Sequence, residues 1–359
     1  MSDSISGPSS VCCSSRPARA FARLRAHRRK IVGAILLLVV IVPNALAFMH
    51  AWSFTHFSES GTRPRPPEML SVLERGAVLL TGVRLARPSN RETPEDYGLD
   101  FRVHRLANSA GQRLEAWHIP CQAPRGLCIL FHGYAASKAS LLPEAAAFHS
   151  LGYDALLLDF RGSGGSDGAA TTLGYSEAGD VAAAVQFAQL DLQADSPILF
   201  GRSMGSVAIL RAVQEGMKPK AIILECPFNR LLDTVGNRFT AMGVPSFPFA
   251  EMLVFWGGVQ QGYSGFDHNP VDYARAAQCP VLLLHGLGDP RVTHEQAREV
   301  FENIASEKRL VTFAGIGHEP YLAKEPDRWR SAIEVFLNDQ SYGDSPAASS
   351  TVRTTASSK

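Results

Sequence analysis

Residues 201–205 form the pentapeptide Gly-Arg-Ser-Met-Gly, which carries the residue types of a nucleophilic turn. The pentapeptide follows the apolar run Pro197–Phe200 and precedes a stretch typical of a helix. A serine between a strand and a helix can occupy a sharp turn that exposes its hydroxyl, provided that the flanking residues let the backbone approach its neighbours. Gly201 and Gly205 meet this condition because they carry no Cβ. The pattern predicts that Ser203 attacks a carbonyl carbon.

A nucleophilic serine needs a base, and the base needs a group that orients it. Asp289 lies in a glycine-rich segment directly after a strand-like run, and His318 lies after the next such run, between Gly317 and Glu319. Both residues therefore stand at the carboxyl ends of predicted strands, where the loops of a parallel sheet meet. The chain order Ser203, Asp289, His318 is the order in which α/β-hydrolases carry their triad. We predict Ser203 as nucleophile, His318 as base and Asp289 as acid.

Glu225 is a competing candidate for the acid, because it ends the preceding strand-like run. Asp289 is preferred, since its glycine-rich loop offers reach, whereas Pro227 follows Glu225 closely and favours turning that residue into the fold. Four other histidines fit the role of base less well, because two precede a glycine in a tight turn and two lie early in edge-like strands. They are His132, His285, His104 and His118.

The apolar run Cys128–Phe131 ends in a His-Gly-Tyr sequence that can supply hydrogen-bond donors. An oxyanion formed during acyl transfer is stabilised by backbone amides aimed at it. The amide of Tyr134 can point toward the nucleophile, because Gly133 permits a close approach of the backbone. Met204, directly after the nucleophile, supplies the second amide. We therefore predict an oxyanion hole made by Tyr134 and Met204.

A second glycine-rich segment, residues 159–166, follows another strand-like run. It lacks both spacing patterns of phosphate-binding loops, so it predicts a tight structural turn near the site, with Asp159 and Arg161 as a local ion pair. No group of His, Cys and Asp has the spacing of metal ligands, and His318-Glu319 lacks the second histidine of a zinc-binding helix. The sequence predicts neither a metal ion nor a cofactor.

The candidate residues depend on alternating strands and helices for their positions. Most of the later strand-like runs are nearly continuous Leu, Ile and Val, which is typical of strands covered on both faces. Helical stretches between the runs predict an α/β fold, with a mostly parallel central sheet and helices on both faces. Strands are expected at residues 114–119, 127–131, 154–159, 197–200, 221–225, 281–284 and 309–313, and helices at 141–151, 176–190, 205–215, 293–304 and 326–337.

One connection is far longer than the others. About 55 residues separate Glu225 from Val281, against a usual handful. The insert, residues 227–278, is apolar and aromatic. Long inserts at the carboxyl edge of such a sheet are typically lids over a site. Extra core packing is the alternative, and part of the insert is expected to serve it.

The N-terminus combines a basic block with an apolar run. Residues 1–30 hold seven Lys and Arg and one acid, so they carry +6, while the rest of the chain carries −5. Residues 31–49 follow with Asn44 as their one strongly polar residue, and their helix of about 28 Å is close to the hydrocarbon thickness of a bilayer. The pattern favours an uncleaved, single-pass anchor in the cytoplasmic membrane, with its basic flank in the cytoplasm. The remainder would lie outside the cytoplasmic membrane, in the periplasm if the source is a Gram-negative bacterium.

Two other interpretations of this segment stay open. Ala45-Leu46-Ala47 fits the cleavage site of a secretory signal peptide, which would release the protein after Ala47. A buried helix of a soluble protein is the third interpretation, although a basic block beside a long uncharged apolar run is unusual there. The expected parts are a disordered basic tail (1–30), a transmembrane anchor (31–52), a linker with a helical stretch at 68–80 (53–98), a catalytic domain (99–338) and a disordered tail (339–359).

Cysteine positions bear on the compartment. Cys121 and Cys128 bracket a turn between two strand-like runs, so a hairpin could bring them together and an oxidising compartment would permit a disulfide. Two unpaired thiols are an equal alternative. Cys226 and Cys279 lie at opposite edges of a parallel sheet and are not expected to pair.

Composition excludes several classes of protein. With 45% hydrophobic and 19% charged residues over 359 positions, the chain is neither disordered, nor collagen-like, nor a small disulfide scaffold. Its length suits one large domain or two average ones. A net charge of +1 gives no indication of nucleic-acid binding.

The chain resembles the α/β-hydrolases, in the branch of the prolyl-oligopeptidase-like and monoacylglycerol-lipase-like serine hydrolases. It is most similar to bacterial membrane-anchored members whose substrate is unassigned. The likeness covers about residues 100–338 and is carried by HGYAASKASLL, LLLDFRGSGGSDG, GRSMG, ECPF, HGLGDPRVT and GIGHEPY. The resemblance implies the triad and oxyanion-hole residues assigned above. Arg202 departs from the His, Glu or Tyr common at its position, without affecting the mechanism.

The sequence thus predicts a carboxylesterase-like or lipase-like serine hydrolase that cleaves an ester, thioester or amide through an acyl-enzyme. It does not predict an oligomeric state. An apolar lid and a membrane anchor favour a small hydrophobic acyl substrate. One rival is a serine peptidase of the prolyl-oligopeptidase kind, for which no additional recognition domain is evident. The other is a non-enzymatic, membrane-tethered binding protein, against which the complete triad argues.

Overall fold

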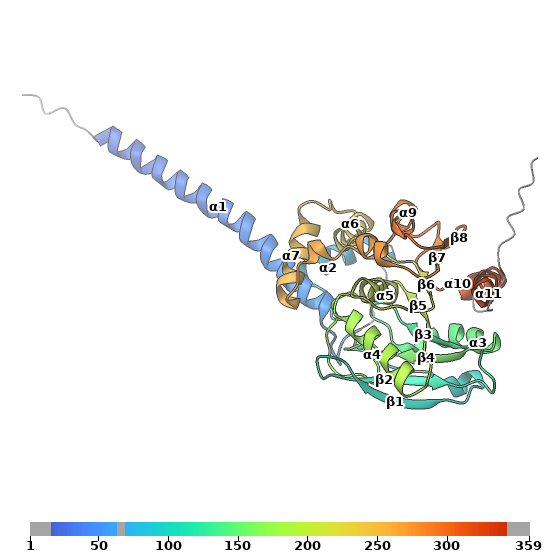
Figure 1. Ribbon diagram of the computed structural model, residues 1–359. Coiled ribbons are helices and arrows are strands. Elements are labelled where there is room, and N and C mark those ends of the chain that lie inside the picture. The colour runs from blue at the N-terminus through green and yellow to red at the C-terminus, as the bar shows by residue number, and fades with distance from the viewer. Residues whose placement is uncertain (1–15, 63–68, 343–359) are drawn as a thin grey trace, which may run out of the picture. The chain divides into compact units, whose positions relative to one another are not determined.

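The computed structural model describes residues 16–62 and 69–342, and the chain divides between Ala47 and Phe48 into two compact units. Within the described residues, the larger unit holds an eight-stranded sheet in the order β1-β2-β4-β3-β5-β6-β7-β8 (Figure 1). The β1-β2 and β2-β4 pairs are antiparallel and the other pairs are parallel. The strands are β1 (Arg102–Ala107), β2 (Arg113–Ile119), β3 (Leu127–Phe131), β4 (Asp154–Leu158), β5 (Ile198–Arg202), β6 (Ala221–Glu225), β7 (Val281–Gly286) and β8 (Lys308–Phe313).

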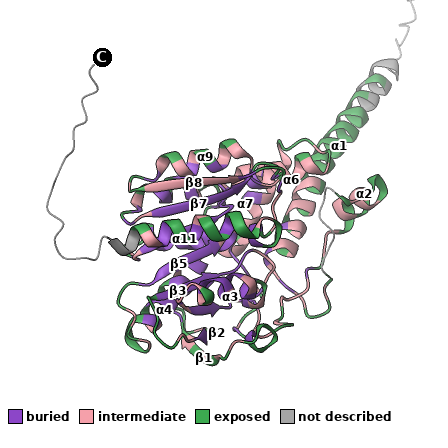
Figure 2. Cartoon of the chain, turned by 90° about the vertical axis from the view of Figure 1, so that its right-hand side faces the viewer, coloured by how far each residue is buried: buried purple, intermediate pink, exposed green. Residues whose placement is uncertain are grey.

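The central strands are buried on both faces because their side chains alternate between two hydrophobic layers. In β3, Leu127, Ile129 and Phe131 belong to one layer, while Cys128 and Leu130 belong to the other. Figure 2 shows the buried strands behind α11. The predicted mostly parallel sheet with helices on both faces is confirmed. The covering helices are α3 (Leu142–Ser150) and α11 (Pro326–Tyr342) on one face, and α4 (Glu177–Leu190), α5 (Met204–Gln214) and α9 (His294–Asn303) on the other.

Strand β1 is not expected from the sequence, whereas the seven predicted strands all form within one or two residues of their expected ends. Strand β1 mixes basic and apolar residues without strict alternation, and most of its side chains are exposed at the antiparallel edge of the sheet. An edge strand is held by backbone pairing with its neighbour and buries little apolar surface. Its hydrophobic pattern is therefore too weak to reveal it.

Strand β4 lies between β2 and β3, so the hairpin considered for Cys121 and Cys128 does not form. The Sγ of Cys121 instead lies 3.3 Å from the carbonyl oxygen of Tyr153, and Cys128 is buried within β3. Both thiols are free, as are those of Cys226 and Cys279. The disulfide interpretation is therefore wrong, because it assumed that strands adjacent in the sequence are adjacent in the sheet.

The insert between β6 and β7 contains α6 (Leu231–Ala241) and α7 (Phe249–Gln261). Most side chains of these two helices are partly exposed. The last part of the insert belongs to the core, since Val271 and Tyr273 are buried in the layer shared with α5 and α9. This part consists of the short helices η4 (Gly265–Asp267), α8 (Pro270–Tyr273) and η5 (Ala274–Ala276).

Helix α1 spans Arg16–Thr55. The basic block from Arg16 to Lys30 is therefore helical, which corrects the disordered tail expected there; residues 1–15 lie outside the described residues. Lys and Arg are good helix formers, so charge alone does not indicate disorder. The large apolar side chains of residues 31–42 are 44–64% exposed. Within the described chain, Arg25–Thr55 is the one helix long and apolar enough to cross a membrane.

Two other expected boundaries shift. Helix α2 spans Val72–Thr81 and begins after Ser71, whose hydroxyl accepts from the Glu74 amide while the Glu74 carboxylate accepts from the Ser71 amide. This reciprocal pair satisfies the free amides of the first turn and sets the start of the helix. The start expected at Glu68 falls among residues 63–68, outside the described chain. Helix α11 continues to Tyr342, so the tail expected from 339 begins as helix, and its remainder lies outside the described residues.

Candidate active site

The predicted nucleophilic turn is a strained connection between β5 and α5. Ser203 has φ 51° and ψ −113°, which a non-glycine residue rarely adopts. Its amide donates to the carbonyl oxygen of Glu225 at 2.7 Å. A Cβ at Gly205 would lie 2.2 Å from the carbonyl oxygen of Phe131, and Gly201 is equally crowded by the start of α5. The close approach of backbone therefore requires both glycines.

His318 joins Ser203 to Asp289 through its two ring nitrogens. Nε2 lies 3.0 Å from Ser203 Oγ, and Nδ1 lies 2.6 Å from Asp289 Oδ2. Asp289 stands in the loop after β7 and His318 in the loop after β8. A carboxylate acceptor at Nδ1 selects the tautomer protonated there, which leaves the Nε2 lone pair facing the serine hydroxyl. The arrangement can accept the proton of Ser203.

Asp289 is a buried carboxylate with several hydrogen-bond donors. Its Oδ1 accepts from the amides of Arg291 at 2.8 Å and Val292 at 3.1 Å, while Oδ2 faces His318. Burial would raise the pKa of Asp289, but the hydrogen bond and charge of His318 and the two amides outweigh it and hold the pKa below its ordinary value. Asp289 is therefore an anion at neutral pH.

The loop after β3 runs beside the nucleophilic turn. A Cβ at Gly133 would lie 3.7 Å from the Cβ of Ser203, so the two backbones are in contact. Among the hydrogen bonds of the described residues, neither the amide of Tyr134 nor that of Met204 has an acceptor. Met204 is the first residue of α5, where helix amides have no intrahelical partner. Two amides are therefore available to a ligand beside Ser203.

The end of α1 supports the side chains of both residues. The Tyr134 hydroxyl donates to the carbonyl oxygen of Phe54 at 2.6 Å. The Sδ of Met204 lies 3.4 Å from the hydroxyl of Thr171, and the Thr171 amide donates to the carbonyl oxygen of Thr55 at 2.9 Å. The last turn of α1 thus belongs to the wall of the candidate site.

Two residues near the nucleophile are not among the predicted site residues. The Ser206 hydroxyl donates to the carbonyl oxygen of Gly201 at 2.6 Å and accepts from the amide of Glu225 at 3.1 Å, so it ties the turn to β6. Cys226 has φ 44°, and its Sγ lies 3.9 Å from His318 Nε2. Sequence reasoning missed both, because a serine in a helix and a cysteine after a strand are ordinary in type and spacing.

Arg202, directly before the nucleophile, lies between two buried glutamates, with 11% of its side chain exposed. It pairs with Glu144 and, at 3.4 Å, with Glu225. Burial would lower the pKa of Arg202, but the charges of the glutamates raise it above its ordinary value. Burial also raises the pKa of Glu225, against the opposing charge of Arg202. Glu225 accepts from the amide of Tyr321 at 3.2 Å, so its carboxylate contacts Arg202 and Tyr321 and not His318.

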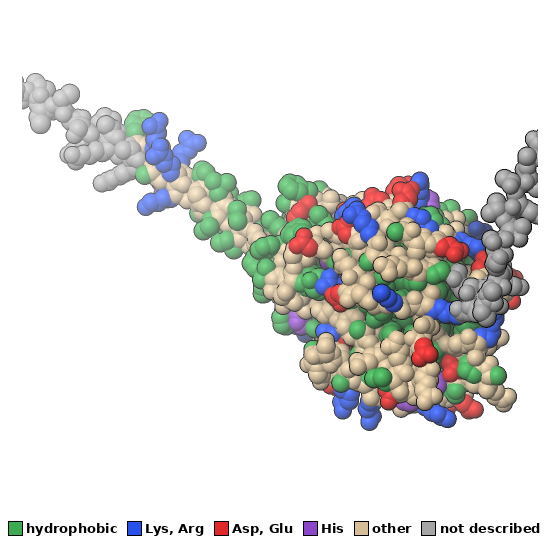
Figure 3. All heavy atoms as spheres, viewed as in Figure 1, with side chains coloured by type: hydrophobic (Ala, Val, Ile, Leu, Met, Phe, Trp, Pro, Cys, Tyr) green, Lys and Arg blue, Asp and Glu red, His purple; other side chains and the backbone are tan. Residues whose placement is uncertain are grey.

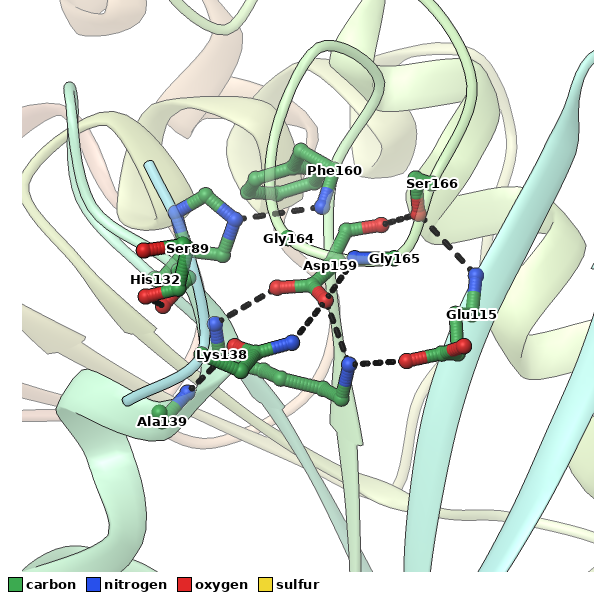
Figure 4. A network of polar contacts seen from close by, with 12 residues as sticks. Ser89, Glu115, His132, Lys138, Ala139, Asp159, Phe160, Gly164, Gly165 and Ser166 are labelled. Atoms are coloured by element: carbon green, nitrogen blue, oxygen red, sulfur yellow. Dashed lines mark hydrogen bonds and ion pairs between the residues drawn. The ribbon is translucent and has the colours of Figure 1, made fainter. Parts of the chain in front are cut away.

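A second ion cluster is centred on the buried Asp159, directly after β4 (Figure 4). Lys138 is fully buried, and its Nζ pairs with Asp159 and, at 2.9 Å, with Glu115. Asp159 also accepts from the amides of Lys138 and Gly165, both at 2.8 Å. A Cβ at Gly164 would lie 1.9 Å from the Asp159 carboxylate, so the glycine-rich segment wraps closely around it. This segment is a structural turn.

The ion pair expected between Asp159 and Arg161 is wrong. Arg161 pairs with Asp180 in the first turn of α4, at 2.7 Å, while Asp159 pairs with Lys138. The Asp159 carboxylate is buried, and besides Lys138 it accepts from the side-chain amide of Asn90 at 2.8 Å. Arg161 lies two residues further along the turn and faces α4.

Of the other histidines, His132 and His118 have hydrogen-bond partners, whereas His285 is buried without one among the described residues. His132 lies with Nδ1 2.8 Å from the carbonyl oxygen of Gly133, and its Nε2 accepts from the amide of Phe160 at 3.1 Å, which joins two loops (Figure 4). His285 is buried in β7, and burial lowers its pKa to about 4. His118 lies 3.2 Å from a carboxylate of β4. Within the described chain, no group of three or more His, Cys, Asp or Glu could hold a metal ion.

Comparison with known proteins gives consistent matches. Residues 122–253 match the family model Hydrolase_4, described as serine aminopeptidase, S33. The uncharacterized protein Rv2307c of Mycobacterium tuberculosis is 31% identical over 235 residues, which cover 64% of this chain and 76% of that protein. The lysophosphatidylserine lipase ABHD12 of Danio rerio is 23% identical over 65% of this chain and 66% of its own. The Pyrococcus furiosus esterase Pf2001 shares the fold, with a TM-score of 0.61 and 22% identity over 71% of this chain and 98% of that one.

Proposed function

Since the chain belongs to the α/β-hydrolase superfamily, we propose that it is a membrane-tethered serine hydrolase that cleaves the ester bond of a hydrophobic acyl substrate. One observation carries the proposal: contacts of 3.0 and 2.6 Å connect Ser203 through His318 to Asp289. This is the order of groups that activates a serine hydroxyl toward a carbonyl carbon.

Acylation follows from these contacts. His318 Nε2 takes the proton of Ser203 as Oγ attacks the carbonyl carbon, and the carboxylate of Asp289 stabilises the imidazolium that forms. The amides of Tyr134 and Met204 donate to the oxyanion of the tetrahedral intermediate. His318 then protonates the leaving alcohol, and the acyl group stays on Ser203. A water activated by the same imidazole releases the acid and regenerates the enzyme.

The insert and the relatives support an apolar acyl group. Helices α6 and α7 carry many large apolar side chains that are only partly buried. Two of the similar proteins are described as a lysophosphatidylserine lipase and an esterase. We propose that residues 227–278 form a lid whose apolar side receives the acyl chain, and that residues 99–338 form the catalytic domain.

We further propose that α1 is an uncleaved anchor of the cytoplasmic membrane, with the catalytic domain on the outer side. The exposed apolar run at 31–42 and the basic flank before it support this topology. A reporter active only outside the cytoplasm should give signal when fused after Asn338. The protein should also keep residues 1–47 and resist extraction with carbonate. A soluble protein that begins at Phe48 would mean cleavage after Ala47, as in a secreted protein.

Activity-based labelling tests the proposed reaction. A fluorophosphonate probe should label the full-length protein and should not label Ser203→Ala, because the probe phosphonylates an activated serine. Unlabelled wild-type protein would favour a tethered binding protein over an enzyme. A panel of p-nitrophenyl esters of rising chain length, beside an amino-acid p-nitroanilide, measures the preferred acyl group.

A serine aminopeptidase is the second candidate, because the matched family model carries that description. A peptidase of this kind needs an anionic group that binds the free amine of its substrate. Faster hydrolysis of aminoacyl p-nitroanilides than of p-nitrophenyl esters, corrected for the greater ester reactivity in buffer, would favour it. The ester preference proposed here predicts the opposite ranking.

A further inference from the structure

Helix α7 packs against the part of α1 that belongs to the larger unit. Trp256 makes an edge contact with Phe48, with 5.4 Å between the ring centroids. Gln260 Nε2 donates to the carbonyl oxygen of Phe48 at 2.8 Å. A Cβ at Gly257 would lie 4.0 Å from that of Ala51. Helix α7 therefore lies alongside the first turn of the larger unit.

Helix α2 lies beside the same turn. The Nε2 of His50 lies 2.9 Å from the carbonyl oxygen of Leu79 near the end of α2. None of the residues of α2 is buried, although Val72, Leu73 and Leu80 are large and apolar and are 70–87% exposed. A soluble protein rarely leaves such a cluster of apolar side chains in water. The face of α2 therefore needs a cover.

Helix α7 exposes apolar side chains next to this turn as well. Phe255 and Val259 lie one helical turn apart and are 49% and 56% exposed. They line a hollow of about 510 Å³ together with Phe266. The one charged residue of α7, Glu251, lies in the first turn of the helix. Hydrophobic side chains gather over α7 in Figure 3.

We propose that these side chains form an interfacial surface that lies in the headgroup and upper acyl layer of the bilayer that α1 enters. The interfacial surface consists of Trp52, Val72, Leu73, Leu80, Phe255 and Val259. The proposal rests on the anchor proposed above and deepens the proposed function, because it presents the catalytic domain to esters held in a membrane.

The geometry of α1 favours a bilayer over a protein partner as the cover. An α-helix rises about 1.5 Å per residue, so Trp52 lies about 5 Å beyond the end of the apolar segment at Met49, within the headgroup layer. Half-exposed Trp52 is of the type that prefers this layer. Leu79 near the end of α2 and Gln260 near the end of α7 contact residues within about one turn of Trp52, so these two helix ends lie at a similar depth. One leaflet covers both helices at once.

The candidate active site shares this end of α1. The hydroxyl of Tyr134 donates to the carbonyl oxygen of Phe54, two residues beyond Trp52. The backbone amide of Thr171 donates to the next carbonyl oxygen, that of Thr55. The side-chain hydroxyl of Thr171 contacts Met204. A lipid ester in the covering leaflet is therefore held close to the loops that would bind its oxyanion.

Depth-resolved fluorescence quenching of the full-length protein in phosphatidylcholine proteoliposomes tests the proposal. A background with Cys12→Ser, Cys13→Ser and Cys121→Ser removes three native cysteines, and the other three are buried. Single cysteines at Leu73 and Val259, labelled with bimane, report on α2 and α7. Quencher lipids carry a nitroxide either near the headgroup or deep in the acyl chain.

Two further positions serve as matched controls. The first control is Leu190→Cys. Leu190 is 71% exposed and is the last residue of α4, a helix that contacts the edge strand β1. Leu36→Cys lies inside the proposed span, five residues from its start. All four labelled positions carry exposed aliphatic side chains, three leucines and one valine, so the labels differ mainly in predicted depth.

We expect the shallow nitroxide to quench the labels at Leu73 and Val259 at least about threefold more than the label at Leu190, because interfacial helices lie about 5–10 Å into the headgroup boundary. The deep nitroxide should quench the label at Leu36 most. Equal quenching at Leu73, Val259 and Leu190 overturns the interfacial surface. An unquenched label at Leu36 overturns the anchor and the surface together.

The quenching result is independent of turnover, so it separates this proposal from the proposed reaction. A protein with interfacial quenching that fails to bind the fluorophosphonate probe refutes the hydrolase reaction and leaves the surface supported. A labelled, active protein without interfacial quenching refutes the surface alone.

Discussion

Asp289 and Glu225 are buried carboxylates at the ends of neighbouring strands, and only Asp289 contacts the imidazole of His318. Asp289 accepts from two backbone amides as well as from His318, and its pKa lies below the ordinary value despite burial. Glu225 accepts from one backbone amide and shares Arg202 with Glu144, and burial raises its pKa.

The difference teaches what a strand end must supply to make a carboxylate an orienting group. Asp289 lies in a loop beyond β7, where the following amides can turn back toward its side chain. Glu225 is the last residue of β6, so its backbone belongs to the sheet and to the turn that it supports through the amide of Ser203. A buried anion is stable where donors converge on it, and the loop supplies more of them.

The largest expected effect is that of Ser203→Ala, which removes the group that either acid would serve. The kcat for p-nitrophenyl esters should fall by about 10⁶-fold, because the acyl-enzyme cannot form. The melting temperature should stay at the wild-type value, since the side chain faces His318 and leaves no core cavity. Activity above a few per cent of wild type would reveal another nucleophile and remove the basis of the comparison.

The next effect separates the two acids directly. Asp289→Asn should lower kcat by about 10⁴-fold, because the amide favours the wrong tautomer of His318. Glu225→Gln should leave kcat near the wild-type value, since its carboxylate contacts Arg202 and Tyr321. Steady-state kinetics with the same ester measure both. The reverse outcome, with only Glu225→Gln inactive, would reassign the acid.

A smaller effect is expected on stability when Arg202, the cation that pairs with Glu225, is replaced. Arg202→Met should lower the free energy of unfolding by about 3–5 kcal/mol, because two glutamates are left buried without a cation. Arg298→Met is the matched control: its partner Glu302 is exposed, so the cost should be about 0–1 kcal/mol. Denaturant unfolding in detergent compares the two. Equal costs would contradict a structural role for the buried cluster.

The smallest effect is a difference in pH dependence. Asp289 has a native pKa below 3.8, so its contribution to stability is fully present above pH 3.8 and is lost as the pH falls through the native pKa. Glu225 has a native pKa above 4.5, so its contribution is fully present below pH 4.5 and is lost as the pH rises through the native pKa.

Differences in melting temperature between wild type and each variant isolate these contributions, because other titrating groups cancel. The difference from Asp289→Asn should grow as the pH rises through the region below 3.8. The difference from Glu225→Gln should shrink as the pH rises above 4.5. Parallel profiles would show that the two carboxyls titrate alike and would break the comparison.

Local sequence determined the elements and the residues at their ends. Ser203 stands out because a strand and a helix flank two glycines, and the structure shows why both glycines are needed. Asp289 and His318 stand out because each follows a strand, and parallel strands deliver their ends to one edge. These patterns span a few residues each, so they can be recognised without knowing which strands pair.

Only the tertiary structure decided which distant residues meet. Strand β4 enters between β2 and β3, which separates Cys121 from Cys128. Lys138, from a neighbouring loop, takes the place expected for Arg161 beside Asp159. Strand order and side-chain direction arise from the packing of layers whose local patterns are alike, so the sequence by itself predicts that an acid is buried but not which partner compensates its charge.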